Sequence, residues 1–260
     1  MDQKKMAESV MEIAHRAGAA IMKIYDGDPA QLQVEQKSDE SPLTIADREA
    51  NRIICKGLEA LSPRLPIVSE ENKMVPFAER KRYTHFWLVD PLDGTKEFIK
   101  RNGEFTVNIA LIQQQVVELG VVYAPVLNEM YYAIKGEGAW LRQDSQTIPL
   151  SAKSFALTDP GLRVVCSRSH LNDDTQAFVD ALDQPELVPK GSSLKFLILA
   201  KGEAHLYPRL GPTMEWDTAA AQIVLEEAGG EVLCEDSGTP LRYNKEILRN
   251  PHFIAYGHKK

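Results

Sequence analysis

The chain has 260 residues, 43% of them hydrophobic, so it can bury the core of one large domain or of two closely packed lobes. Its net charge of −7 argues against a nucleic-acid binder that depends on a basic surface. The three cysteines, Cys55, Cys166 and Cys234, form no CxxC pair, so we expect no thiolate zinc site. The first ten residues lack a signal-peptide core, and no apolar run is long enough to cross a bilayer. We therefore expect a cytoplasmic protein with no obligate membrane partner; peripheral association with the inner membrane face stays open.

Two amphipathic helices are predicted at the start of the chain. Apolar residues recur at helical spacing over 6–24, and the turn-forming residues 26–29 end that pattern. A second helical pattern covers 46–61, and two prolines follow it. Thr44 and Asp47 fit the first turn of this second helix, as a capping pair.

Short strands follow these helices. Residues 66–69 and 86–89 are apolar runs, and each is followed directly by acidic residues. Three longer segments are rich in Val, Ile and Tyr and are separated by short turns. Their spacing predicts an antiparallel meander over 104–113, 115–124 and 128–134.

The pattern changes near residue 150, where predicted strands and helices begin to alternate, as in α/β structure. We therefore predict an N-terminal α+β lobe over 1–150 and a C-terminal α/β lobe over 151–260, packed as one unit with the site between them. The strands expected in the second lobe are 162–166, 204–207 and 230–234, and the helices are 171–182, 193–201 and 217–228.

The densest group of chemically active residues is Asp90-Pro91-Leu92-Asp93-Gly94-Thr95, directly after an apolar run. Asp-Pro and Asp-Gly are ordinary turn formers, so a plain turn is one interpretation. Uncompensated carboxylates are costly beside a buried strand, however. A loop of this kind can turn both carboxylates to one side while the N–H groups of Gly94 and Thr95 face an anion. Such hard oxygen ligands suit Mg²⁺, which also binds substrate phosphate.

This hexapeptide resembles the D-P-[IL]-D-G-T signature of the inositol monophosphatase superfamily, whose members are metal-dependent and typically lithium-sensitive phosphatases. Three other segments resemble further parts of the family pattern in the expected order: 44–47, 69–71 and 216–220. The likeness spans nearly the whole chain. It implies a two-lobed, layered α-β-α-β-α fold of the sugar-phosphatase type, with an antiparallel sheet in the first lobe.

By this resemblance, two or three Mg²⁺ ions are bound. Glu70, Asp90 and the carbonyl of Leu92 would hold one ion, and Asp90, Asp93 and Asp217 a second. Two cations that share Asp90 would lie roughly 3.5–4 Å apart and would clamp the attacking and leaving oxygens of an in-line displacement. A carboxylate that opens a helix, as Asp217 is expected to do, is also stabilised as an anion.

The resemblance implies that Thr95 and Asp47 position the attacking water and take up its proton, and it groups Glu70 with them in the catalytic set. Ordinary structural roles compete with these assignments. Asp47 and Asp217 can each be a helix cap. Periodicity does not separate Glu70 from Glu71; only the position in the motif selects Glu70.

The C-terminal half points to the kind of phosphate ester. Residues 191–196 combine two hydroxyls with a lysine, and 167–170 and 207–209 each follow a predicted strand. Taken singly, these are capping serines and solvated charges. Together they resemble the 3′(2′),5′-bisphosphate nucleotidase branch of the superfamily, in which such residues bind a nucleotide with a second phosphate. The implied substrate-binding residues are Leu92, Asp93, Gly94, Thr95, His170, Ser192, Lys195, Arg209 and Asp217.

The resulting hypothesis is a phosphomonoesterase that removes the 3′-phosphate of adenosine 3′,5′-bisphosphate and yields AMP and phosphate. Its partner is then a small nucleotide rather than a nucleic-acid polymer. An inositol monophosphatase would share the metal chemistry but act on another ester. A non-catalytic nucleotide- or metal-sensing module would need no water-activating pair. Fructose-1,6-bisphosphatase is disfavoured by the length of the chain and by its nucleotidase-like segments.

Overall fold

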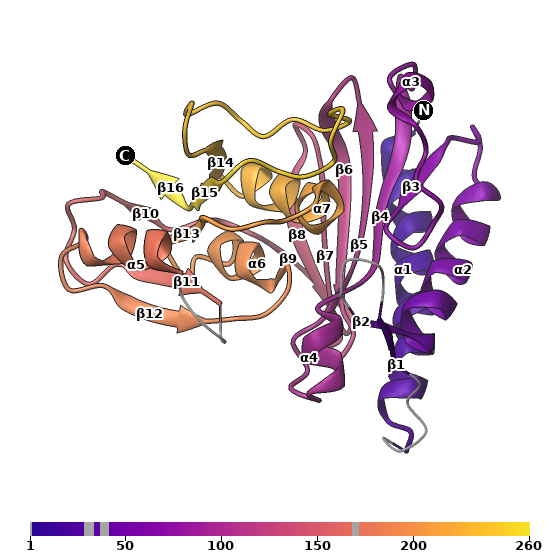
Figure 1. The fold of residues 1–260 in the computed structure, drawn as a ribbon, viewed down its shortest axis with the longest axis horizontal. Helices are drawn as coiled ribbons and strands as arrows, with labels where there is room; N and C mark the ends of the chain where they lie inside the picture. Colours follow the sequence, from indigo (N-terminus) through magenta and orange to yellow (C-terminus); the bar gives the residue numbers. More distant parts are fainter. Residues whose placement is uncertain (1, 29–33, 37–41, 168–171) are drawn as a thin grey trace.

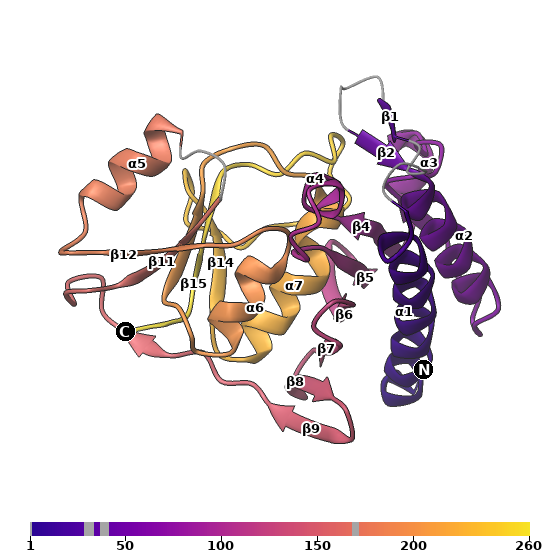
Figure 2. The same cartoon turned by 90° about the horizontal axis from the view of Figure 1, so that it is seen from below.

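The computed structural model describes residues 2–28, 34–36, 42–167 and 172–260. Its helices and strands lie in alternating layers, helix–sheet–helix–sheet–helix, as Figures 1 and 2 show. The predicted layered α-β-α-β-α fold is therefore confirmed. Within the described ranges, no helix is both long enough and apolar enough to span a membrane.

The first helical layer consists of α1 (Gln3–Tyr25) and α2 (Ile45–Glu59), which cover one face of a seven-stranded sheet. In this sheet β3 is parallel to β4, and each later neighbour is antiparallel, so the predicted meander is confirmed and two further strands extend it. In spatial order the strands are β3 (Ile67–Ser69), β4 (His85–Asp93), β5 (Thr106–Gln113), β6 (Val116–Ala124), β7 (Glu129–Ile134), β8 (Gly138–Gln143) and β9 (Gln146–Pro149).

The middle layer consists of α6 (Leu194–Ala200) and α7 (Glu215–Glu227), and α5 (Asp173–Asp180) lies outside the second sheet. The second sheet is five-stranded and mixes parallel and antiparallel pairs. Its order is β12 (Glu186–Pro189), β11 (Arg163–Cys166), β13 (Leu206–Arg209), β15 (Phe253–Tyr256) and β14 (Glu231–Cys234). The short elements are α3 (Phe77–Arg80), α4 (Thr95–Ile99), and the pairs β1 (Val34–Gln36) with β2 (Pro42–Thr44) and β10 (Ser154–Phe155) with β16 (His258–Lys259).

The strands β4 to β7 of the seven-stranded sheet are buried on both faces, and the period-2 alternation of β4 assigns its side chains to the two faces. Phe86 and Leu88 pack into the core that contains α6 and α7. Trp87 and Val89 pack into the core that contains α1 and α2. Full burial of such side chains contributes roughly 1.5–3 kcal/mol each. The strand is therefore fixed in register, and so is the face on which Asp90 emerges.

The segment that begins at Asp90 differs from the prediction of a loop after residue 89. β4 continues to Asp93, where Asp90 pairs with Asn108 and Asp93 pairs with Thr106. Three steps along β4 thus oppose two steps along β5, which is the arrangement of a β-bulge. Pro91 lies in this irregular stretch, where its missing N–H removes no regular ladder bond. The bulge therefore changes the direction of the side chains between the two aspartates.

Helix α7 packs tightly on the seven-stranded sheet at Gly120 of β6. A Cβ added at Gly120 would lie 2.4 Å from the carbonyl oxygen of Ala220 and 2.5 Å from Cγ2 of Ile223. The backbone oxygen cannot move aside, so a side chain at this position would push the helix away from the sheet. Helix α7 belongs to the second half of the chain but packs on a sheet of the first half, so both halves share one core. This packing does not test the predicted boundary between two lobes at residue 150, which stays a prediction.

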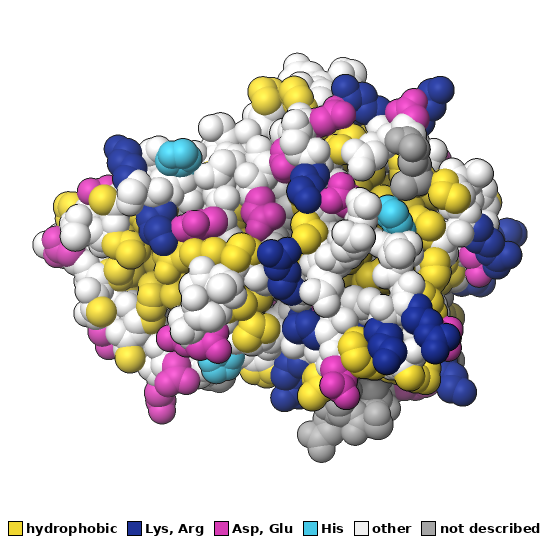
Figure 3. Space-filling model, turned by 90° about the horizontal axis from the view of Figure 1, so that it is seen from above, with side chains coloured by type: hydrophobic (Ala, Val, Ile, Leu, Met, Phe, Trp, Pro, Cys, Tyr) yellow, Lys and Arg dark blue, Asp and Glu magenta, His cyan; other side chains and the backbone are white. Residues whose placement is uncertain are grey.

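The face drawn in Figure 3 carries Lys and Arg side chains interspersed with Asp and Glu, and hydrophobic side chains lie between them. Neither sign of charge covers this face. A polyanion would need a continuous basic surface, which this face does not offer.

Candidate active site

Two neighbouring parallel strands bring Glu70 and Asp90 together. Val68 of β3 and Leu88 of β4 pair side by side and face α6 and α7. Side chains two residues further along each strand emerge on the same face, which places Glu70 and Asp90 there. The backbone N–H of Glu70 donates to the carbonyl of Val89 at 3.1 Å and continues the pairing of the strands to this point.

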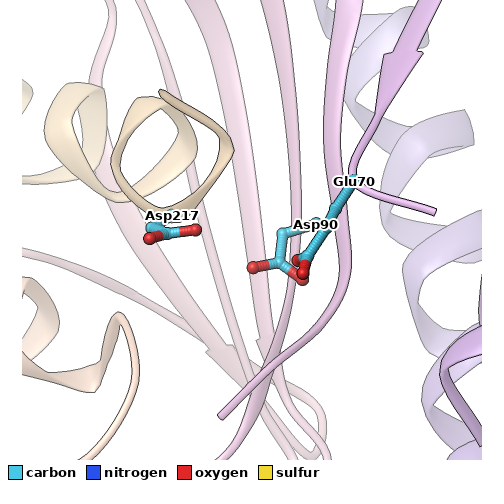
Figure 4. Close-up of side chains that lie close together, drawn as sticks. All are labelled: Glu70, Asp90 and Asp217. Atoms are coloured by element: carbon cyan, nitrogen blue, oxygen red, sulfur yellow. The ribbon is translucent and has the colours of Figure 1, made fainter. Parts of the chain in front are cut away.

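Asp217 meets these two residues from the opposite layer, on the first turn of α7. Figure 4 shows its carboxylate pointing from the helix toward Asp90 and Glu70. One ligand oxygen from each of the three carboxylates lies within 4.8 Å of the others. The backbone N–H of Met214 donates to Oδ2 of Asp217 at 2.9 Å, so Asp217 also caps its own helix. The capping and metal-ligand interpretations of Asp217 are thus compatible.

Two of the three carboxylates, Asp90 and Asp217, lie in an environment that disfavours their charges. Asp90 is 2% exposed, and burial raises its pKa well above the usual value, with further increases from Glu70, Asp93 and Asp217. Burial also raises the pKa of Asp217 to about 8, assisted by the charge of Asp93. Such a cluster is stable in its ionised form only with a compensating cation. The donor set is all oxygen, which fits Mg²⁺.

Asp93 is held by the C-terminal half of the chain. Its Oδ2 accepts hydrogen bonds from Oγ of Ser192 and from the backbone N–H of Ser193, both at 2.6 Å. Two residues of β5 support these serines. Oγ1 of Thr106 lies 2.7 Å from the hydroxyl oxygens of both Ser192 and Ser193, and Oδ1 of Asn108 accepts from the hydroxyl of Ser193 at 2.9 Å. Asp93 is not one of the three residues whose carboxylate oxygens lie within 4.8 Å of one another. Its role as a metal ligand stays a prediction.

Asp47 and Thr95 are in direct contact beside this cluster. Oγ1 of Thr95 donates to Oδ1 of Asp47 at 3.0 Å and lies 3.3 Å from the carbonyl of Leu92. Oδ2 of Asp47 accepts from the backbone N–H and the hydroxyl of Thr44, at 2.8 and 2.6 Å. The predicted capping pair at the start of α2 is therefore confirmed. Asp47 uses one oxygen for the cap and presents the other to Thr95.

Gly94 connects the bulge to α4 in a conformation that only glycine adopts easily. Its φ is 96°, and an added Cβ would lie 2.9 Å from the carbonyl oxygen of Glu104 and 3.3 Å from Cβ of Ser192. A larger residue would therefore separate residues 90–93, here called the aspartate segment, from residues 190–193. Thr95 follows as the first residue of α4.

A pocket of about 310 Å³ opens between the aspartate segment and the C-terminal half. Lys195 lies on its wall, 8% exposed, with Nζ donating to the carbonyl of Ser192 at 2.9 Å and lying 5.5 Å from the ring centre of Tyr207. Burial lowers the pKa of Lys195 to about 8. Arg209 also lines the pocket; its Nη2 donates to the carbonyl of Pro212 at 2.8 Å, and its buried Nε has no hydrogen-bond partner.

The predicted substrate residues that line this pocket are Asp93, Gly94, Ser192, Lys195, Arg209 and Asp217. His170 lies outside the described residues. Sequence reasoning missed Thr106 and Asn108, which hold the pocket wall together with Ser193, one of the two hydroxyls noted in 191–196. The available signal was the pair of polar residues at alternate positions of an otherwise apolar strand, since a buried polar side chain needs a partner.

The layered fold, with an acidic cluster beside a pocket lined by cations, defines the class of the protein: a phosphatase built from alternating helical and sheet layers. The model of the inositol monophosphatase family matches residues 2–257. The chain therefore belongs to the inositol monophosphatase family.

The similar proteins include nucleotidases of this family. A 3′(2′),5′-bisphosphate nucleotidase CysQ of Salmonella typhimurium is 46% identical over 95% of this chain and 98% of its own length. The crystal structure of CysQ from Bacteroides thetaiotaomicron aligns with a TM-score of 0.85 and 40% identity over 98% of both chains. An IMPase/NADP phosphatase complexed with Mg²⁺ and phosphate aligns with a TM-score of 0.71 and 22% identity over 88% of this chain and 82% of its own, which indicates a shared fold.

Proposed function

We propose that this protein is a Mg²⁺-dependent 3′(2′),5′-bisphosphate nucleotidase that converts adenosine 3′,5′-bisphosphate to AMP and phosphate. The observation that carries the proposal is the juxtaposition of two features: a carboxylate cluster that calls for cations, and a pocket that is lined both by Asp217 of this cluster and by the cationic side chains of Lys195 and Arg209. The similarity to CysQ nucleotidases over nearly the full chain supports the same substrate class.

The residues present fit Mg²⁺ as the cofactor. Glu70, Asp90 and Asp217 would hold it, with Asp93 and the Leu92 carbonyl as the further ligands suggested by the family motif. When bound, Mg²⁺ supplies Lewis-acid chemistry: it stabilises negative charge that develops on phosphoryl oxygens and makes water a better nucleophile at neutral pH. The negative charge of the cluster would hold the ions, and the low dielectric of the surrounding apolar layers would strengthen this attraction.

Asp47 and Thr95 would handle the attacking water. Thr95 donates its hydroxyl hydrogen to Asp47, so its oxygen lone pairs are free to accept a hydrogen bond from water and to aim that water at the phosphorus. Oδ1 of Asp47 lies at the end of this contact and can take up the proton. Since Thr44 fixes the other oxygen, the carboxylate is held in one orientation before substrate binds.

Lys195 and Arg209 would bind the phosphate that is not transferred. Among the described residues, Lys195 is buried with no carboxylate within ion-pair distance, and the buried Nε of Arg209 has no hydrogen-bond partner. A phosphate group would satisfy both, since it offers several strong acceptor oxygens. An inositol monophosphate carries no second phosphate for these two cations, so they favour the nucleotidase.

A substrate panel tests the proposal. Phosphate release should be fastest with adenosine 3′,5′-bisphosphate, and both EDTA and the omission of Mg²⁺ should abolish it. A preference for inositol 1-phosphate would reassign the protein to the monophosphatases. Binding of the nucleotide without phosphate release would identify a sensing module instead.

Replacing Lys195 or Arg209 by Met is expected to lower kcat/KM for adenosine 3′,5′-bisphosphate by about 10- to 100-fold. Each substitution deletes a charge-assisted hydrogen bond worth about 1.5–3 kcal/mol, at 1.4 kcal/mol per factor of ten. Adenosine 3′-monophosphate lacks the second phosphate, so it should be a poor substrate whose turnover changes little. Steady-state kinetics on the two nucleotides measure this selectivity; equal losses on both would remove the two cations from the proposed role.

The same assay has a pH dependence. The pKa of Lys195 is lowered to about 8, so the ammonium charge is present below that pH and is lost as the pH rises through it. KM for the bisphosphate should therefore rise above about pH 8 in the wild type, and this rise should be absent in Lys195→Met. The monophosphate serves as the internal control, because its KM should not follow this titration.

A further inference from the structure

The first turn of α7, which carries Asp217, is enclosed by residues 242–250, here called the enclosing segment. The N–H of Glu215 donates to the carbonyl of Leu248 at 2.8 Å, and the N–H of Asn250 donates to the carbonyl of Thr213 at 2.9 Å. The side-chain amide of Asn250 also donates to the carbonyl of Met214 at 2.8 Å. The enclosing segment has little regular secondary structure, so its shape depends on these contacts.

Glu215 is the centre of this arrangement. It is 0% exposed, and its two carboxylate oxygens accept from the backbone N–H groups of Asn244 and Lys245 at 2.6 and 3.0 Å. The ammonium group of Lys245 lies 2.6 Å from Oε1 of Glu215 and also donates to the carbonyl of Arg242 at 2.8 Å. A buried carboxylate without such partners would be strongly destabilising. Glu215 therefore fixes the enclosing segment to the start of α7.

The enclosing segment is attached in turn to the N-terminal half of the chain. Arg80 of α3 is 2% exposed; its Nη1 donates to Oδ1 of Asn244 at 2.9 Å, and its Nη2 to the carbonyl of Glu246 at 2.6 Å. The side-chain amide of Asn244 donates back to the carbonyl of Arg80 at 2.8 Å. The start of α7 is thus anchored, through Glu215 and Asn244, to the half of the chain that supplies Glu70 and Asp90.

We propose that Glu215 is a positioning residue for the metal site: it holds the first turn of α7 so that the carboxylate of Asp217 meets Glu70 and Asp90. This inference rests on the proposed function, in which Asp217 is a metal ligand. The physical reason is the narrow tolerance of a Mg²⁺ site, where ligand distances vary by only about 0.2 Å. Glu215 is two residues before Asp217, on the same turn, so a change in its contacts is transmitted directly to that carboxylate.

The test compares two isosteric substitutions on the same helix. Glu215→Gln keeps the size of the side chain but cannot offer acceptors to all three N–H groups. Glu227→Gln is the matched control at the other end of α7, where Glu227 accepts from the backbone N–H groups of Gly136 and Gly138 at 2.8 and 2.9 Å. Both substitutions remove a charged anchor of α7, but only the first lies beside Asp217.

Divalent-cation affinity is measured without substrate, by Mn²⁺ electron paramagnetic resonance titration of the full-length protein. The Mg²⁺ concentration for half-maximal phosphate release and the nucleotide KM at saturating Mg²⁺ are measured in parallel. Glu215→Gln should weaken Mn²⁺ binding and raise the Mg²⁺ requirement by about 10- to 100-fold, with little change in nucleotide KM. Glu227→Gln should lower the melting temperature without changing either metal parameter.

Lys245→Met provides a second variant in case Glu215→Gln fails to fold. It keeps both backbone contacts of Glu215 and removes only the ammonium partner, so it should weaken Mn²⁺ binding in the same direction by a smaller factor. Unchanged Mn²⁺ affinity in the folded Glu215 and Lys245 variants, or an equal loss in Glu227→Gln, would overturn the positioning role. If the wild type itself shows no Mn²⁺ binding that Asp217→Asn abolishes, the proposed metal site fails, and the positioning role fails with it.

Discussion

Replacing Asp90 by Asn is expected to lower turnover at saturating Mg²⁺ by a factor on the order of 10³ or more, because several kcal/mol of charge stabilisation depend on the bound ions. Asp90 is the deeply buried member of the carboxylate cluster, between Glu70 and Asp217. The loss of one negative charge there should weaken every cation position in the cluster. Phosphate release from adenosine 3′,5′-bisphosphate measures the effect.

The same substitution should not destabilise the metal-free protein. The pKa of Asp90 is raised well above that of an unfolded chain, first by burial and then by Glu70 and the other acids. At neutral pH, above the unfolded pKa, the ionised carboxyl therefore costs stability in the folded state, and Asn removes that cost. Thermal unfolding in EDTA should show a melting temperature at or above that of the wild type, and Mg²⁺ should no longer raise it.

Asp144→Asn is the matched control for this experiment. Asp144 lies in the exposed turn between β8 and β9 with φ of 54°, a conformation that Asn also tolerates. Its turnover and its response to Mg²⁺ should equal those of the wild type. Near-wild-type turnover of Asp90→Asn in saturating Mg²⁺ would contradict the assignment of the cluster as the metal site.

Asp47→Asn and Thr95→Ala are each expected to lower kcat by about 10²–10⁴-fold while KM changes little. Both residues are proposed to act on the attacking water, so their contribution should appear in the transition state rather than in substrate binding. Thr95→Ser keeps the hydroxyl that contacts Asp47 and should retain most of the activity. A higher KM with unchanged kcat would instead make the pair part of the substrate pocket.

The pH profile of kcat, compared between the wild type and Thr95→Ala, tests the role of Asp47 further. Burial raises the pKa of Asp47, and the hydrogen bond from Thr95 lowers it in part. The acid limb of the wild-type profile should therefore lie above the ordinary aspartate range, with activity lost as the pH falls and Asp47 becomes protonated. In Thr95→Ala the compensating hydrogen bond is absent, so this limb should shift to higher pH. An unshifted limb would show that another group controls it.

Local sequence patterns were sufficient for much of the fold. The apolar spacing over 6–24 and 46–61 predicted the helices that cover the first sheet, and β-branched residues after short turns predicted the meander. These predictions succeed because the period of burial is a property of each element by itself. The cap of Thr44 and Asp47 was predictable for the same reason, since both partners lie within one helical turn.

The acidic motif identified the site, but its geometry required the tertiary structure. Periodicity did not choose between Glu70 and Glu71, because the pattern of so short a strand does not say which face will meet α7. That choice depends on the pairing of β3 with β4 and on the helix packed above them. Similarly, the strand was expected to end at residue 89, and only its pairing with β5 revealed the bulge that separates Asp90 from Asp93.

The sequence by itself therefore determined the main helices, the meander strands, their order and the residue types of the site, all of which depend on neighbours a few positions apart. The tertiary structure alone decided which distant residues support them. Asp93 is held by Ser192 and Ser193, and Glu215 by residues of an irregular segment about thirty positions later. Buried polar groups must find partners, but no local rule of spacing says where in the chain those partners are.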